Sequence, residues 1–122
     1  MLITPIASGS TGNAYHVTDG VSSLLLDAGV PLAKIQQGCG FKTSRLAGCL
    51  VTHSHGDHIK GAKDLARIGI DVYASRGALE HKALSGHRFH PVKALESFQI
   101  PGWDILPFDV EHDAPEPLGF LI

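Results

Sequence analysis

The chain alternates short apolar runs with segments whose apolar residues recur at helical spacing. The unbroken run Leu24-Leu25-Leu26 predicts a strand that is buried on both faces. This alternation is typical of a layered α/β domain, and the length suits a single domain spanning residues 1–122. Strands are predicted over residues 2–6, 13–17, 22–29, 46–52, 72–74, 103–110 and 117–122, and helices over 32–37, 58–69 and 75–84.

Turn and cap residues mark several boundaries of these elements. Asp19-Gly20 indicates a hairpin, and Pro31 can open a helix at its first turn. Ser75 is a helix cap for the segment that follows it. Pro107 interrupts the last long strand, and because proline lacks an N–H we expect that strand to be bent or to lie at a sheet edge.

The charge balance provides no global field that would attract nucleic acid, because the formal net charge of the 122 residues is −2. An anionic substrate would therefore need a local charge, such as a metal ion. The N-terminus lacks a signal-peptide pattern, and no apolar stretch approaches the ~18 residues of a membrane-spanning helix. Cys39 and Cys49 form no CxxC pair. We expect reduced thiols, a cytoplasmic location and no membrane association.

The segment THSHGDH, residues 52–58, concentrates potential metal ligands directly after a predicted buried strand. His53 and His55 are two positions apart, so in an extended segment both imidazoles point the same way. Asp57 and His58 follow where the chain turns into a helix, and Gly56 is expected to relieve the turn between the pairs. Neutral imidazole suits zinc, manganese or iron. The alternative is a polar loop of hydrogen-bonded histidines, which is disfavoured because crowding this many imidazoles without a cation is costly.

The motif HSHGDH matches the HxHxDH signature of the metallo-β-lactamase superfamily. Upstream, LLLDAG resembles the strand end that carries a family aspartate, here Asp27, and downstream FDVEHDAPEPLGFLI resembles the segment that carries the next histidine ligand, here His112. The opening ASGSTGNAYHV is most similar to the branch with exonuclease-like and cyclic-phosphodiester-cleaving members. The resemblance implies an αββα sandwich, of which this chain matches the N-terminal half.

The resemblance also implies roles for individual residues. His53, His55 and His112 would bind one metal ion, and Asp57 and His58 would contribute to a second. Zinc is expected, as one or two ions, with manganese or iron as alternatives. The family's later bridging aspartate and final histidine have no counterpart here, and neither Asp113 nor Glu116 is assigned the bridging role.

Asp57 is also the candidate catalytic residue, because it can orient the nucleophile as well as bind a metal. Asp27 is a candidate for positioning a ligand from behind. An ordinary Asp-Ala-Gly turn at the end of a strand is an equally good interpretation of Asp27.

The implied activity is metal-dependent hydrolysis of a phosphodiester or nucleotide-type substrate by a metal-held hydroxide. Two alternatives remain open: a thioester or lactam hydrolase of the same superfamily, and a non-catalytic one-metal binding module. Half of a sandwich would expose an apolar inner face. We therefore expect a homo-oligomer or a complementing C-terminal half.

Other polar residues have weaker functional interpretations. The glycine-rich segment 8–13 is interpreted as a tight turn between strands, with a phosphate-binding loop as the alternative. Lys60 is expected to be a solvated helix residue, although it could meet a phosphate. The remaining downstream histidines, His81, His87 and His90, are expected at the surface or in loops.

Overall fold

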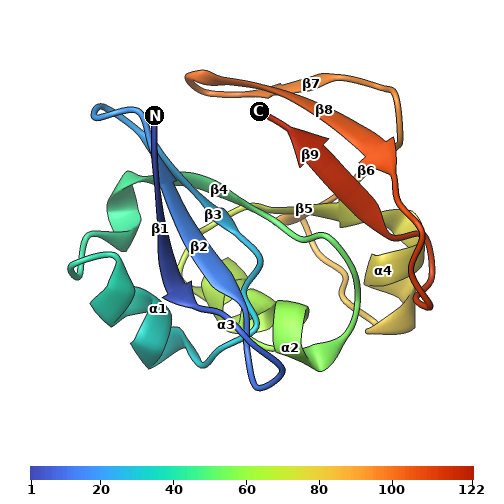
Figure 1. Cartoon of the computed structure of the whole chain (residues 1–122), viewed down its shortest axis with the longest axis horizontal. Helices are drawn as coiled ribbons and strands as arrows, with labels where there is room; N and C mark the ends of the chain where they lie inside the picture. The colour runs from blue at the N-terminus through green and yellow to red at the C-terminus, as the bar shows by residue number, and fades with distance from the viewer.

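A computed structural model describes all of residues 1–122, and its main layer is a six-stranded sheet (Figure 1). The strands lie in the order of the sequence, with antiparallel pairing among the first three and parallel pairing from the third onward. The strands of this sheet are β1 (Leu2–Ala7), β2 (Ala14–Thr18), β3 (Ser23–Leu26), β4 (Leu46–Leu50), β5 (Val72–Ser75) and β6 (Phe89–Val92).

Helices connect the parallel strands and lie together on one face of this sheet (Figure 1). This placement follows from the strand order. Each parallel strand from β3 to β6 is added on the same side of the previous one, and because the crossover connections are all right-handed, their helices lie on the same face. None of the helices has the length and apolar character needed to cross a membrane. The helical segments are α1 (Leu32–Gly38), the 3-10 turn η1 (Thr43–Arg45), α2 (Gly56–Ile59), α3 (Ala62–Arg67) and α4 (Arg76–His81).

A second, antiparallel sheet covers the other face of the first (Figure 1). Its strands are β7 (Phe98–Ile100), β8 (Trp103–Asp109) and β9 (Leu118–Leu121), with β8 in the centre. The molecule thus has a helical layer, a large sheet and a small sheet. These layers confirm the predicted α/β sandwich and correspond to three of the four layers of an αββα arrangement.

Two apolar clusters fill the spaces between these layers. The three consecutive leucines show the division: Leu25 belongs to the cluster under the helices, whereas Leu24 and the partly buried Leu26 pack toward the second sheet. The prediction that this strand is buried on both faces is therefore confirmed. Cys39 and Cys49 are free thiols and belong to the helix-side cluster.

The helix predicted over residues 58–69 is wrong as a continuous element. It is divided into α2 and α3 at Gly61, whose N–H donates to the Ala28 carbonyl at 2.7 Å instead of to a carbonyl of its own helix. A Cβ at Gly61 would collide with the carbonyl oxygen of Val30, so the close approach requires glycine. The break lets the chain that follows the histidine motif pack directly against residues 28–30.

The strand β8 that contains Pro107 is central in its sheet, so of the two alternatives, a bent strand or an edge strand, the edge holds only locally, at Pro107. Pro107 pairs with Phe120 of β9, but β7 pairs with β8 only as far as Ile105. The Pro107 carbonyl accepts a hydrogen bond from the Leu95 N–H at 2.8 Å. Its ring nitrogen faces that same side, away from β9, so no ladder hydrogen bond is lost.

His90 is also placed differently from the prediction. It belongs to strand β6, not to a loop, and its ring stacks on Tyr73 with centroids 4.8 Å apart.

Candidate metal centre

The histidine motif lies at the carboxyl ends of the central parallel strands. His53 and His55 follow β4, and Asp27 follows the adjacent strand β3. The N–H of Leu118, the first residue of β9, donates to the Thr52 carbonyl at 2.7 Å. This bond brings the loop of residues 110–117, between β8 and β9, to the motif.

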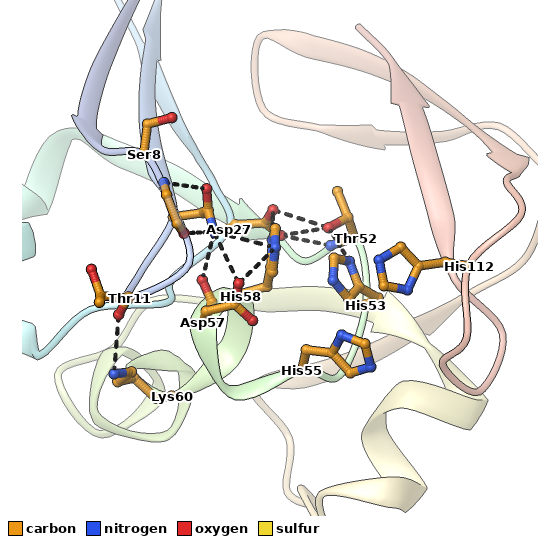
Figure 2. A network of polar contacts seen from close by, with 12 residues as sticks. Ser8, Thr11, Asp27, Thr52, His53, His55, Asp57, His58, Lys60 and His112 are labelled. Atoms are coloured by element: carbon orange, nitrogen blue, oxygen red, sulfur yellow. Dashed lines mark hydrogen bonds and ion pairs between the residues drawn. The ribbon is translucent and has the colours of Figure 1, made fainter.

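Three histidines converge at this point, as Figure 2 shows. Donor nitrogens of His53, His55 and His112 all lie within 4.8 Å of one another, which is close enough for the group to hold a metal ion. The ring centroids of His53 and His112 are 4.2 Å apart, and each lies 4.9 Å from His55. His53 is buried, His55 is half-buried and His112 is exposed, so the group opens to solvent on one side.

Asp57 and His58 form a second group of donors beside the three histidines. The His58 Nε2 atom lies 3.5 Å from the Asp57 Oδ2 atom, and the rings of His53 and His58 have centroids 3.8 Å apart. Both residues belong to the short helix α2, as the turn into a helix predicted. The structure therefore brings together all five residues for which metal ligation was expected.

Asp27 contacts His58 directly and His53 through Thr52, on the buried side of the site. Its carboxylate accepts hydrogen bonds from the Thr52 backbone N–H at 2.7 Å and from the Thr52 hydroxyl at 2.9 and 3.0 Å. Its Oδ2 atom also lies 2.7 Å from the His58 Nδ1 atom. Asp27 is buried and has a φ of 62°, a left-handed conformation that costs energy for a residue with a Cβ and is retained when its contacts compensate.

These contacts determine which ring nitrogens carry protons. An ionised carboxylate only accepts, so His58 Nδ1 is the donor to Asp27, and in the neutral ring His58 Nε2 keeps its lone pair. The Thr52 hydroxyl gives its single proton to Asp27, so it accepts from His53 Nδ1 at 2.9 Å. His53 Nε2 is then also unprotonated. A metal requires such lone pairs, and the arrangement fits a cation at this site.

The electrostatic environments of His53 and His58 differ. Burial and the neighbouring His58 and His112 lower the pKa of His53 from 6.5 to about 4, so His53 is neutral at pH 7. The hydrogen bond to Asp27 raises the pKa of His58. A neutral, buried imidazole beside two others suits the binding of a metal ion.

Asn13 also contacts this site, although no motif in the sequence marks it as a site residue. Its Nδ2 atom lies 3.3 Å from both Asp57 Oδ2 and His58 Nε2, and it donates to the Gly9 carbonyl at 2.8 Å. The segment 8–13 is a turn between β1 and β2, as expected, but its last residue contacts the motif. The signal available in the sequence was an amide side chain at the end of a glycine-rich loop.

Two further contacts involve residues that were predicted to be solvated. The exposed Lys60 reaches the Thr11 carbonyl at 3.5 Å (Figure 2). His81, at the end of α4, places its Nδ1 atom 2.7 Å from the hydroxyl of Ser54, the fully buried residue between His53 and His55. His81 is thus exposed but anchored, whereas His87 lies in an exposed turn as predicted.

The glycine in the middle of the motif is not required by its conformation. Gly56 is absent from the residues with positive φ, and a Cβ there would meet no atom within 4 Å. The expectation that Gly56 relieves a strained turn is therefore wrong. Gly29 takes the closely packed position instead, because a Cβ there would overlap the Asp57 carbonyl.

Comparison with known proteins agrees with this geometry. The family described as "Beta-lactamase superfamily domain" matches residues 12–122. Exodeoxyribonuclease WalJ of Streptococcus pneumoniae serotype 2 is 36% identical over 126 residues, which cover 92% of this chain and 46% of that protein. Exodeoxyribonuclease YycJ of Bacillus anthracis is 38% identical over 128 residues, covering 94% and 47%. The chain thus spans about half the length of the curated relatives it matches.

Solved structures show the same fold. The metallo-β-lactamase fold protein YhfI of Bacillus subtilis aligns with a TM-score of 0.74 at 18% identity, covering 97% of this chain and 55% of that one. The Rm3 metallo-β-lactamase aligns with a TM-score of 0.76 at 20% identity, covering 97% and 52%. The family match covers most of the chain, and the fold is that of the solved metallo-β-lactamase structures. The chain therefore belongs to the β-lactamase superfamily, as its histidine motif predicted.

Proposed function

We propose that this chain carries the metal centre of a metal-dependent hydrolase that cleaves phosphodiester bonds, with nucleic acid as the substrate class. The convergence of His53, His55 and His112 within 4.8 Å is the observation that supports it most directly. The names of the relatives, both exodeoxyribonucleases, support the choice of substrate.

Each residue has a defined role in this proposal. His53, His55 and His112 hold one ion, and Asp57 and His58 contribute to a second. Zinc is the expected metal because the donors are mainly imidazoles, and manganese or iron suits the same set. When bound, the ions supply Lewis acidity, which activates water and neutralises charge on the phosphoryl oxygens.

The chain's own residues prepare this chemistry. Asp27 holds the Nδ1 proton of His58 and, through Thr52, orients His53, so neither ring must reorganise when the site fills. Asp57, about a third exposed at its side chain, is accessible enough to orient the attacking nucleophile. The net charge of −2 leaves substrate attraction to the metal centre rather than to the whole surface.

Hydrolysis of bis(p-nitrophenyl) phosphate and of single-stranded DNA, with zinc, manganese or iron(II) added, tests the proposal. We expect metal-dependent turnover that His55→Ala abolishes. The control is His87→Ala, which removes an exposed histidine outside the site and should retain turnover. Selective turnover of a thioester or lactam would favour the second enzyme class. One bound metal without hydrolysis of any substrate would favour a binding module.

We also propose that residues 1–122 form a single domain whose sandwich is completed by a C-terminal portion or by a second copy of the chain. The curated relatives are about twice as long. The second sheet also exposes Phe108 and Leu121, and Val110 is exposed directly after β8. A complementing C-terminal portion or a second copy of the chain would cover these residues. Native mass spectrometry distinguishes a dimer from a monomer and counts the metals bound per chain, and fractionation of cells tests the expected cytoplasmic location.

A further inference from the structure

The loop of residues 110–117 presents His112 with little support of its own. His112 and its neighbours Glu111 and Asp113 are exposed, and the loop contains no helix or strand. Its C-terminal end is held by the Leu118 N–H, which donates to the Thr52 carbonyl. A further restraint is needed to direct the loop from this end toward His112, because a loop fixed only at its ends keeps conformational freedom.

Glu116 provides such a restraint. Its Oε1 atom accepts a hydrogen bond from the Gly77 backbone N–H at 2.8 Å. The other polar side-chain contacts of residues 110–117 are those of the exposed Asp113, whose Oδ1 atom lies 3.1 Å from His112 Nδ1 and 3.8 Å from His55 Nε2. Gly77 is the second residue of α4, where the first N–H groups lack partners within the helix. The next donor, the Ala78 N–H, is taken by the Ser75 hydroxyl at 3.1 Å. Glu116 therefore satisfies a donor that the helix itself leaves free.

The packing at this contact is tight and specific. A Cβ on Gly77 would come within 2.8 Å of the Glu116 Cβ and 3.4 Å of the Pro115 carbonyl carbon. Glu116 also has a φ of 49°, a left-handed conformation that a residue with a Cβ adopts at an energetic cost. Both features indicate that the contact with α4 determines the path of the loop.

The other end of the same helix contacts the histidine motif. His81, the last residue of α4, lies 2.7 Å from the hydroxyl of Ser54, between His53 and His55. Helix α4 therefore touches both segments that supply the three histidines, one at each end. The Leu118–Thr52 hydrogen bond also joins these two segments directly, and the Glu116 contact holds the His112 loop to α4.

We infer that Glu116 is a positioning residue that fastens the His112 loop to α4 and so holds His112 beside His53 and His55 before a metal binds. The inference rests on the proposed role of His112 as a ligand, and it assigns to Glu116 no contact with metal or substrate. Preorganised ligands bind more tightly because less freedom is lost on binding. Residues behind a metal site commonly change its affinity 10- to 100-fold when mutated, so we expect about tenfold weaker binding in Glu116→Ala.

The test compares Glu116→Ala, Glu116→Gln and Gly77→Ala, with Glu111→Ala as the matched control. Glutamine keeps an acceptor oxygen for the Gly77 N–H, and Gly77→Ala displaces the loop from the opposite side. Glu111→Ala removes the same charge from the same loop, next to His112, without a contact to α4. Cobalt(II) titration measures affinity, and the visible spectrum of bound cobalt reports the ligand geometry.

We expect Glu116→Ala and Gly77→Ala each to weaken cobalt binding about tenfold and to alter the spectrum. A variant that carries both substitutions should bind cobalt no more weakly than either one, because both disrupt the same contact. Glu116→Gln and Glu111→Ala should stay within about twofold of the unmodified chain. Unchanged affinity in Glu116→Ala, or an equal loss in Glu111→Ala, would overturn the inference.

A metal-free measurement separates this inference from the proposed function. Nuclear Overhauser contacts between the His53 and His112 rings, whose centroids are 4.2 Å apart, should weaken in Glu116→Ala and persist in Glu116→Gln. If the unmodified chain binds no metal but shows this pattern, the proposed function fails and the positioning role stands. If the contacts persist in Glu116→Ala, the positioning role fails.

Discussion

The Nδ1 atom of His58 lies 2.7 Å from the Oδ2 atom of Asp27 (Figure 2). The contact joins the end of β3 to helix α2, two elements that are separated in the sequence by α1, η1 and β4. Asp27 is buried, and the same carboxylate accepts both polar hydrogens of Thr52. One side chain therefore sets the orientation of His58 directly and that of His53 through Thr52.

Replacing Asp27 with asparagine should weaken both stability and metal binding. The amide offers one acceptor where the carboxylate serves three donors, so at least one buried donor loses its partner. We expect a loss of about 1–3 kcal/mol in the free energy of unfolding. Affinity for zinc should fall about 10- to 100-fold, because His58 can no longer be held in one tautomer. Urea denaturation and metal titration measure these effects.

Asp64→Asn is the matched control for Asp27→Asn. Asp64 is partly exposed and pairs with Arg67 at 3.2 Å on the surface of α3. Surface ion pairs of this kind contribute little, so the unfolding free energy should change by less than about 0.5 kcal/mol. Equal losses in the two variants would contradict the special role of Asp27.

Stability of the metal-free chain should pass through a maximum near pH 6.5. The folded-state pKa of His53 is lowered to about 4, so the unfolded chain binds more protons than the folded chain between pH 4 and 6.5. Stability should therefore fall as the pH decreases through this window, by at most about 3 kcal/mol. Burial and the adjacent histidines cause this shift.

The alkaline side of the same curve is controlled by His58. Asp27 raises the folded-state pKa of His58, so the stability from this pair is complete below pH 6.5 and is lost as the pH rises through the raised pKa. Urea unfolding in the presence of a chelator, from pH 4.5 to 8, measures both limbs. His53→Gln should flatten the acidic limb, and a curve that rises steadily to pH 8 would refute this assignment.

Asn13→Asp should make the stability of the chain depend more strongly on metal. The substitution places a carboxylate where an amide donor now meets Asp57 Oδ2 and His58 Nε2, each at 3.3 Å. Repulsion between the two carboxylates should lower the metal-free unfolding free energy by about 1–3 kcal/mol. A bound cation offsets that repulsion, so the rise in Tm on adding zinc should exceed that of the unmodified chain.

Asn13→Ala is the comparison for this experiment, since it removes the same donors without adding a charge. We expect it to be destabilised as well, but with a zinc-induced rise in Tm no larger than that of the unmodified chain. Equal responses of the two variants to zinc would show that the added carboxylate does not face the metal centre.

Two glycines near the motif should respond oppositely to alanine. A Cβ at Gly29 would overlap the carbonyl of Asp57, so Gly29→Ala should cost about 3 kcal/mol or more and impair metal binding. A Cβ at Gly56 would meet no atom, and alanine is the better helix former, so Gly56→Ala should be neutral or stabilising by about 0.5–1 kcal/mol. Thermal unfolding of the two variants, followed by circular dichroism, distinguishes these outcomes.

Local features of the fold could be predicted because they depend on residues close in the sequence. The period-two spacing of His53 and His55 places both rings on one side of an extended segment. Ser75 does cap α4, because a hydroxyl at that position reaches the N–H three residues later. Apolar periodicity identified the buried central strands but overlooked the break at Gly61, which a contact with residues 28–30 produces.

The sequence by itself determined the local order of candidate ligands in the histidine motif, and the similarity of its motifs to a known family identified the superfamily. Only the tertiary structure decided what surrounds that motif: Asn13 and His81 contact it from distant parts of the chain, and Glu116 joins the His112 loop to α4. Such contacts leave no periodic signal in the sequence. They exist because packing the two sheets and the helices brings separate loops to one end of the parallel strands, where each polar group needs a partner.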